Sequence, residues 1–172
     1  MFPSLLRHTL LVGDARALTQ WLARGGSPAS AASADLPGVL THEQIAALAA
    51  APPLDGPALR AAQACTLAVC GAGAAAFPDA RLDQVAAAHA AFHTASFEPH
   101  ELTPSAFVVT RTSGAQRVLC LTNVTPHTQL VPIPWRRMLG SANVRDLLGG
   151  ARLAVHGPSF QLGPWDVRWL GN

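Results

Sequence analysis

The sequence predicts an α+β protein in which an Ala-rich helical segment precedes a small antiparallel β-sandwich domain. Up to residue 104, apolar side chains recur every three or four positions and alanine is abundant. After Pro104 the period changes to two, and Val, Thr and Phe replace alanine. We therefore expect a helical region over residues 1–104, with a linker at 27–38, and a β domain over residues 105–172.

The expected helices are bounded by capping residues, Pro and Gly. Asp14 begins a helix that Gly25-Gly26 end, and Thr41 begins another that stops at Pro52-Pro53. The stretch between them, SPASAASADLPG, has the small, polar and Pro-containing composition of a linker. A third helix is expected from Pro57 to Cys70. A fourth follows Pro78-Asp79, with one side lined by Leu82, Val85, His89 and Phe92.

The expected strands begin with a hairpin. Residues 106–112 and 116–124 flank the short loop Ser113-Gly114-Ala115, and further strands are expected near 128–133, 152–155 and 165–170. In the last strand Trp165, Val167 and Trp169 point one way and Asp166 and Arg168 the other, as in a strand with one buried face. The alternative is that the tryptophans form a platform for sugar stacking.

Composition excludes several classes of function. Only 13% of residues are charged, about half of the usual ~25%, which indicates a surface that is poor in polar groups or partly covered by a partner. A net charge of +2 with scattered arginines predicts no nucleic-acid binding. The sequence has no strongly apolar run of about 20 residues and no signal-peptide pattern, so we expect no membrane partner and a cytoplasmic location. Three cysteines without CxxC spacing predict no metal and no cofactor.

Three segments of the β region resemble the terminal β-sandwich domain of the α-amylase family (glycoside hydrolase family 13), especially its sucrose-phosphorylase-like branch. They are RVLCLTNVTPHTQLVPI (117–133), VRDLLGG (144–150) and FQLGPWDVRWL (160–170). Upstream, HTLLVGDARALTQWLA (8–23), LPGVLTHEQIAALAA (36–50) and AAAHAAFHTASFEPHEL (86–102) resemble pieces of the late barrel and the segment that follows it. The resemblance implies a remnant of a (β/α)₈ barrel, because 172 residues are fewer than the ~250 of a whole one.

The resemblance also implies which catalytic groups are missing. Retaining enzymes of this kind need two carboxyl groups about 5–5.5 Å apart, and this family adds a third. The first two would lie upstream of every matched segment, and the linker 27–38 replaces the third. The residue pairs most similar to the motif that carries the missing third carboxyl group are His42-Glu43 and His100-Glu101. They fall on an expected helix start and an expected loop. GAGAAAF (71–77) replaces the last barrel strand. No catalytic residue is therefore assigned.

Three hypotheses follow. The chain is a truncated or degenerate relative of a sucrose-phosphorylase-like, α-glucoside-active enzyme that is inactive alone. Alternatively, it is a carbohydrate-binding or interaction module that associates with a full-length glycosidase, with Trp135, Trp165 and Trp169 as sugar or partner contacts. As a third hypothesis, it is the C-terminal piece of a split glycosidase that a separate barrel half completes, which the DNA upstream of Met1 would reveal.

Overall fold

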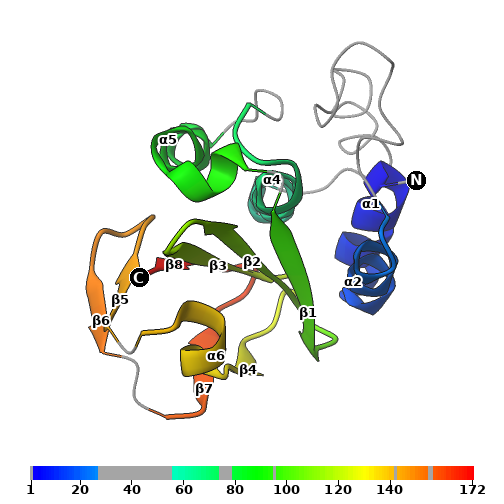
Figure 1. Cartoon of the computed structure of the whole chain (residues 1–172). Helices are drawn as coiled ribbons and strands as arrows, with labels where there is room; N and C mark the ends of the chain where they lie inside the picture. Colours follow the sequence, from blue (N-terminus) through cyan, green and yellow to red (C-terminus); the bar gives the residue numbers. More distant parts are fainter. Residues whose placement is uncertain (1, 27–55, 74–78, 95, 142, 155–156) are drawn as a thin grey trace.

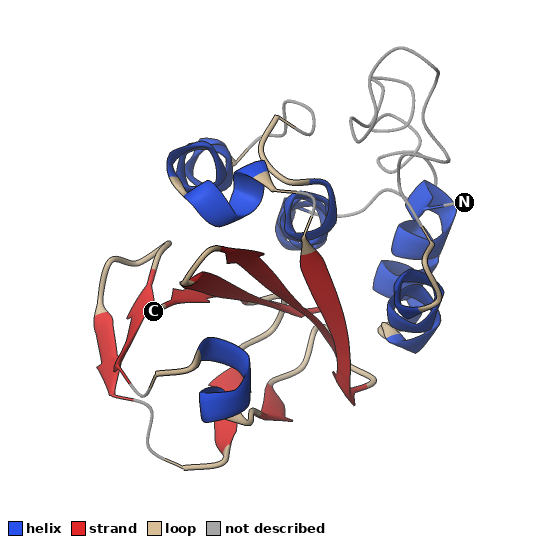
Figure 2. Ribbon diagram, viewed as in Figure 1, coloured by secondary structure: helices blue, strands red, loops and turns tan. Residues whose placement is uncertain are grey.

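The computed structural model describes residues 2–26, 56–73, 79–94, 96–141, 143–154 and 157–172. Helices cover one face of a six-stranded antiparallel sheet, and a two-stranded sheet with a short helix lies on the opposite face (Figures 1 and 2). The predicted combination of helices with antiparallel sheets is thereby confirmed. No helix within the described ranges is long and apolar enough to cross a membrane.

The helices come mainly from the first half of the chain. The helices α4 and α5 lie over the large sheet, whereas α1 and α2 lie beside its edge strand β1 (Figure 1). Their bounds, with the 3₁₀ helix η2, are α1 Phe2–Val12, α2 Arg16–Ala23, α4 Gly56–Cys70, α5 Ala80–Ala88, η2 Ala90–His93 and α6 Trp135–Leu139.

The six-stranded sheet has the order β1-β2-β3-β8-β5-β6, and β4 pairs with β7 in the small sheet. All pairs are antiparallel, and Ser113 pairs with Gln116 across the tight turn between β2 and β3. The strands are β1 Phe97–Thr103, β2 Ala106–Ser113, β3 Gln116–Asn123, β4 Gln129–Pro132, β5 Asn143–Asp146, β6 Arg152–Ala154, β7 Ser159–Leu162 and β8 Val167–Gly171.

Both faces of the large sheet are buried, because residues of β2 and β3 alternate between two cores. Phe107 and Val109 contribute to the core under α1, α2, α4 and α5. Ala106 and Val108 contribute to the core that β4, β7 and α6 cover. We call these the helix-side core and the small-sheet core. The expectation that the last strand has one buried face is therefore wrong. Trp169 is buried on the helix side of the strand, and the next residue, Leu170, is fully buried on the other side, in the small-sheet core.

Most expected elements are confirmed. The hairpin, the helix that ends at Cys70, the helix after Asp79 and the strands near 129 and 152 are all present. Asp14 Oδ1 accepts the backbone N–H of Arg16 at 2.9 Å where α2 begins, and Gly25 follows its end with φ +84°. The linker 27–38 and the helix expected from Thr41 lie outside the described residues.

The sheet begins earlier than expected, at Phe97 instead of after Pro104. As an edge strand, β1 has no fully buried side chain among its residues and contains Pro99, so it lacks the usual apolar alternation. His100-Glu101 consequently lies in a strand and not in the expected loop. The helix α1 was also not predicted, although Phe2, Leu6 and Leu10 recur every four residues and are buried.

Candidate functional site

The junction between the helices and the large sheet is centred on Arg111 of β2, whose residue is 0% exposed. Its Nε donates to the carbonyl of Ala91 at 2.8 Å, and its Nη1 donates to Ala68 and Val69 at 3.0 and 3.1 Å. Its Nη2 donates to the carbonyl of Thr94. Since the last four carbonyls of a helix have no partner within it, Arg111 serves as a C-terminal cap for α4 supplied by the sheet.

An aromatic pair lies beside this guanidinium. The Cζ of Arg111 is 5.5 Å from the ring centroid of Phe92 in η2, and the Phe92 ring is 4.5 Å from that of Trp169 in β8. Both aromatic residues are buried, and the arrangement adds cation–π and ring contacts to the hydrogen bonds. Burial lowers the pKa of Arg111 from its usual range, yet a guanidinium remains charged in proteins.

Gly71 allows the chain to leave α4 close to this junction. Its φ is +86°, and a Cβ built on it would meet the carbonyl oxygen of Phe92 at 2.3 Å. The adjacent backbone N–H of Ala72 donates to that same oxygen at 2.8 Å. Only glycine combines this left-handed backbone with so close an approach.

Polar contacts of Asp79 attach α5 to α4. Asp79 Oδ1 caps α5 by accepting the backbone N–H of Arg81 at 2.9 Å, and Oδ2 forms an ion pair with Arg60 Nε at 2.5 Å. Burial of Asp79 opposes ionisation, but the hydrogen bonds from Arg60 and Arg81 outweigh it and lower the pKa of this carboxyl. The Gln63 side chain also exchanges hydrogen bonds with the Asp79 backbone, at 2.9 and 3.2 Å.

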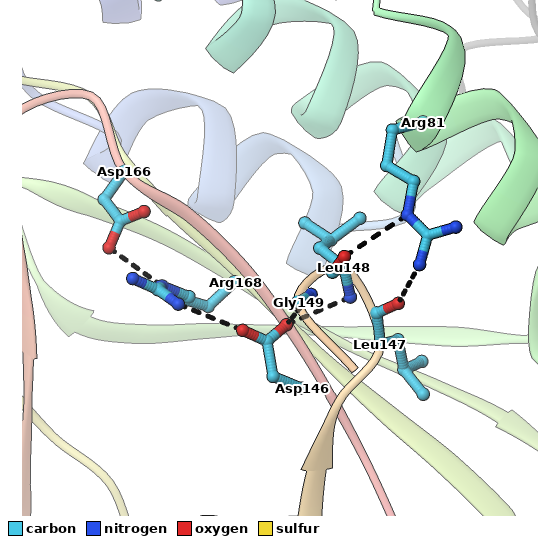
Figure 3. Close-up of polar contacts among 7 residues, drawn as sticks. All are labelled: Arg81, Asp146, Leu147, Leu148, Gly149, Asp166 and Arg168. Atoms are coloured by element: carbon cyan, nitrogen blue, oxygen red, sulfur yellow. Dashed lines mark hydrogen bonds and ion pairs between the residues drawn. The ribbon is translucent and has the colours of Figure 1, made fainter. Parts of the chain in front are cut away.

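The turn after β5 links α5 to the sheet, as Figure 3 shows. Asp146 Oδ1 accepts the backbone N–H groups of Leu148 and Gly149 at 3.0 and 3.2 Å. Arg81 of α5 donates to the carbonyls of Leu148 and Leu147 at 3.2 and 3.4 Å. A Cβ on Gly149 would lie 2.9 Å from Asp146 Oδ2, so a larger residue there would displace this carboxyl group.

The carboxyl groups of Asp146 and Asp166 meet at the guanidinium of Arg168 (Figure 3). Arg168 Nη1 donates to Asp146 at 3.0 Å and its Nε donates to Asp166 at 3.0 Å. The hydrogen bond with Asp166, above all, raises the pKa of Arg168. Because both carboxyl groups are bound to one guanidinium, the arrangement suits a structural contact and not a general acid facing a nucleophile.

Asn123, at the end of β3, holds two loops together from a fully buried position. Its Nδ2 donates to the carbonyls of His127 and Gly163, both at 2.6 Å, and its Oδ1 accepts from the backbone and hydroxyl of Thr125. One loop follows β3 and the other precedes β8. Each of the three resembling β segments therefore contributes a polar residue that makes internal bonds, namely Asn123, Asp146 and Arg168.

The predicted contact residues do not share one core, because Trp135 belongs to the small-sheet core and Trp165 packs against the helix-side core that contains Trp169. Trp169 is 0% exposed in the helix-side core, so its ring is part of that core and is closed to a sugar. Trp135 is 8% exposed in the small-sheet core, where its Nε1 donates to the Gly157 carbonyl at 3.2 Å. Trp165 precedes β8, is partly exposed and has a φ of +53°. Among the described residues, these three tryptophans therefore form no common exposed surface on which a sugar could stack.

The described pockets do not place two carboxyl groups across a sugar-sized space. One pocket, of about 620 Å³, lies at β5, β6 and the C-terminus, and no Asp or Glu lines it. In two smaller ones the only lining carboxyl group is that of Glu98 or that of Asp14. Within the described ranges, no three His, Cys, Asp or Glu side chains gather as a metal site. Burial raises the pKa of the Cys65 and Cys70 thiols to about 12, so both are protonated at neutral pH.

Sequence reasoning missed Arg111 as the centre of the junction. The available signal was its register: Phe107, Val109 and Arg111 share one face of β2, and the first two are core residues. A charged residue that continues an apolar face needs partners in the core. The sequence did not show that these partners would be backbone carbonyls from α4 and η2.

Comparison with known proteins finds no matching family model and no significantly similar curated protein. Among solved structures, AmyP in complex with maltose is 16% identical with a TM-score of 0.44, and the match covers 52% of this chain and 18% of that one. An Anoxybacillus α-amylase is 18% identical, with a TM-score of 0.45 and coverages of 53% and 20%. A MutB mutant in complex with its substrate sucrose is 18% identical, with a TM-score of 0.44 and coverages of 54% and 17%. The chain is thus similar to these enzymes over about half of its own length, and it spans at most 20% of theirs.

Proposed function

We propose that this chain is a non-catalytic structural part of an α-amylase-family-like system that acts on α-glucosides, in which the β domain braces the neighbouring helices. The observation that carries the proposal is Arg111, which reaches from β2 to cap α4 and to hold η2. A buried cation satisfied by backbone carbonyls fixes the position of the helix end relative to the sheet.

The resembling segments support this role because they supply the bracing contacts. Residues 86–102 provide η2 and Phe92, residues 144–150 provide the turn that Arg81 binds, and residues 160–170 provide Trp169. The motifs that resemble the glycosidase family therefore maintain the junction of helices and sheet. This is an architectural role, in keeping with motifs that resemble a terminal domain.

The finer proposal concerns the reaction. The sucrose-phosphorylase-like branch rests on the sequence motifs, and the catalytic carboxylates would come from a barrel half or a full-length glycosidase that associates with this chain. The low charged fraction of 13% supports a covered surface, because an uncharged exterior is tolerable where a partner lies on it.

An activity assay tests the non-catalytic assignment. We expect the purified chain to show neither phosphorolysis of sucrose nor hydrolysis of α-glucosides above buffer. Asp146→Asn and Glu98→Gln variants serve as matched controls. The first removes a buried carboxylate that is paired with Arg168, and the second removes an exposed carboxylate. Turnover that either single substitution abolishes would refute the assignment.

A second candidate function is sugar or partner binding at Trp165. Its partial exposure and its left-handed backbone favour it, since strained residues are often found at functional sites. Calorimetric titration with maltose and with sucrose tests this. Binding that Trp165→Ala removes, while Leu130→Ala at another exposed apolar position retains it, would support the contact; equal heats in both variants would exclude it.

A further inference from the structure

A small polar hollow of about 120 Å³ lies on the small-sheet side, where β1, β2, β3 and α6 meet. Glu98 and His100 of β1, Thr110 of β2, Arg117 of β3 and Arg137 of α6 line it. Its volume holds a few water molecules or one small ion and is too small for a sugar ring with its hydration. None of the bracing contacts described above involves the two arginines that share it.

The hollow has two arginines and one carboxylate, Glu98, so its lining carries an excess of positive charge. Neither Arg117 nor Arg137 forms an ion pair with any described carboxylate. Arg117 Nη1 donates to the carbonyls of Arg137 and Met138 at 3.2 and 3.5 Å, which holds its guanidinium at the end of α6 with Nε and Nη2 making no described hydrogen bond. The charge of Arg137 also acts on His100 across the hollow.

The opposite wall supplies neutral groups and one acceptor. His100 Nε2 lies 2.9 Å from the hydroxyl of Thr110, and the His100 side chain is 14% exposed. Burial lowers the pKa of His100, so the ring is neutral at pH 7. Glu98, with a side chain 71% exposed, lies at the rim with Oε1 3.9 Å from His100 Nδ1.

We propose that this hollow binds a small tetrahedral oxyanion, with inorganic phosphate as the best match. Two guanidinium groups donate to its unprotonated oxygens in charge-assisted hydrogen bonds. The protonated oxygen of hydrogen phosphate donates to Glu98, which sulfate cannot do. The site is distinct from the architectural role proposed above, because the two arginines and His100 make no described hydrogen bond to Arg111 or to the carbonyls that it binds.

Calorimetric titration of the full chain with inorganic phosphate at constant ionic strength tests the site, with Arg137→Gln and Arg136→Gln as a matched pair. Both substitutions remove one positive charge from an exposed position on α6, but only Arg137 lines the hollow. We expect saturable binding that Arg137→Gln weakens at least about tenfold and Arg136→Gln by less than about twofold. The imidazole NMR signal of His100 should shift with the same saturation curve.

Titrations with sulfate and with phenyl phosphate identify the kind of ligand. Sulfate should bind more weakly than phosphate in the wild type, and Glu98→Gln should reduce that preference. Phenyl phosphate should bind more weakly than inorganic phosphate if the ion alone fits the hollow; tighter binding would assign the site to the phosphoryl group of an ester. Absence of saturable binding of either probe, or equal losses in Arg136→Gln and Arg137→Gln, would overturn the proposal.

Discussion

The two cores on either side of the large sheet are built from different kinds of side chain. On the helix side, the alanines of α4 and α5 bring backbones close to the sheet, and large rings fill the remaining space. The small-sheet core instead consists mainly of Leu, Val, Ile and Met with Trp135. Alanine buries little apolar area, so the helix-side core gains less from each helical residue.

Polar contacts compensate for this difference on the helix side. Arg111, Asp79 and Arg81 each join two secondary-structure elements through hydrogen bonds. In the small-sheet core the buried contacts are chiefly apolar, with the Nε1 of Trp135 as a local exception. The comparison teaches that the helices depend on a few directional bonds, whereas the small sheet depends on distributed packing. Each experiment below changes one side of this comparison.

The largest effect is expected for Arg111→Met. The substitution preserves an unbranched side chain but leaves the carbonyls of Ala68, Val69, Ala91 and Thr94 without their donor. We expect the free energy of unfolding to fall by about 3–5 kcal/mol, as measured by urea denaturation. Hydrogen exchange should accelerate first in α4 and η2, while the β4–β7 pair stays protected.

Arg16→Met is the matched control, because the Arg16 side chain is 55% exposed and that of its partner Asp14 is 30% exposed, so water replaces the lost contacts. It should cost much less than Arg111→Met. An equal loss of stability in the two variants, or uniform exchange through both cores, would contradict a junction that rests on Arg111.

A comparison of Trp169→Ala with Trp169→Phe separates packing from hydrogen bonding on the helix side. Truncation to alanine empties the site beside Phe92 and should cost about 3–5 kcal/mol. Trp169→Phe should cost less, because Nε1 makes no hydrogen bond to a described residue. In the small-sheet core Trp135→Phe should lose the bond to Gly157 in addition to area. Trp169→Ala that folds with unchanged stability would show that the ring is not a core residue.

The sequence predicted the regular elements of this molecule better than the contacts between them. Periodicity identified α4 and the β2–β3 hairpin, since their patterns are local and end at Gly or a tight turn. The edge strand β1 was missed because it lacks apolar alternation, and β5 and β7 were missed because four residues carry little pattern. The partners of Arg111 lie up to 43 positions away, and no local rule predicts them.

The candidate site was predictable only in part. The motif around Asp146 was recognised, but its partners Arg81 and Arg168 come from α5 and β8 and depend on tertiary structure. Trp165, Val167 and Trp169 were assigned to one strand, whereas β8 begins at Val167 and Trp165 precedes it with a positive φ. Alternation describes regular strands and fails at a residue that leaves the β region.

Gly71→Ala and Gly73→Ala test the tight exit from α4. Both glycines have a left-handed backbone, with φ of +86° and +83°, so both substitutions carry the strain of about 1–2 kcal/mol for an alanine there. Only Gly71 adds the collision with the Phe92 carbonyl, whereas a Cβ on Gly73 meets nothing within 4 Å. Thermal denaturation should therefore show a clearly larger loss for Gly71→Ala; equal losses would mean that the close approach does not constrain the junction.

The smallest effect is expected for Asp79→Asn, which keeps a good helix cap but removes the charge facing Arg60. Because the pKa of Asp79 is lowered in the folded protein, its ionised form stabilises the fold above the unfolded pKa near 4, and this contribution disappears as the pH falls through the lower folded value. The variant should lose about 0.5–1 kcal/mol at pH 7, and the difference from the wild type should vanish in acid.

Asp83→Asn on the same helix is the control of opposite sign. Burial, opposed by a Gln63 hydrogen bond and reinforced by the charge of Asp79, raises the pKa of Asp83. Its ionised form therefore weakens the fold at neutral pH, so the substitution should leave stability at pH 7 unchanged or raise it. Urea titrations between pH 3 and 7 measure both variants. If Asp79→Asn and Asp83→Asn shift stability in the same direction at pH 7, the attachment of α5 to α4 does not depend on the Asp79 charge.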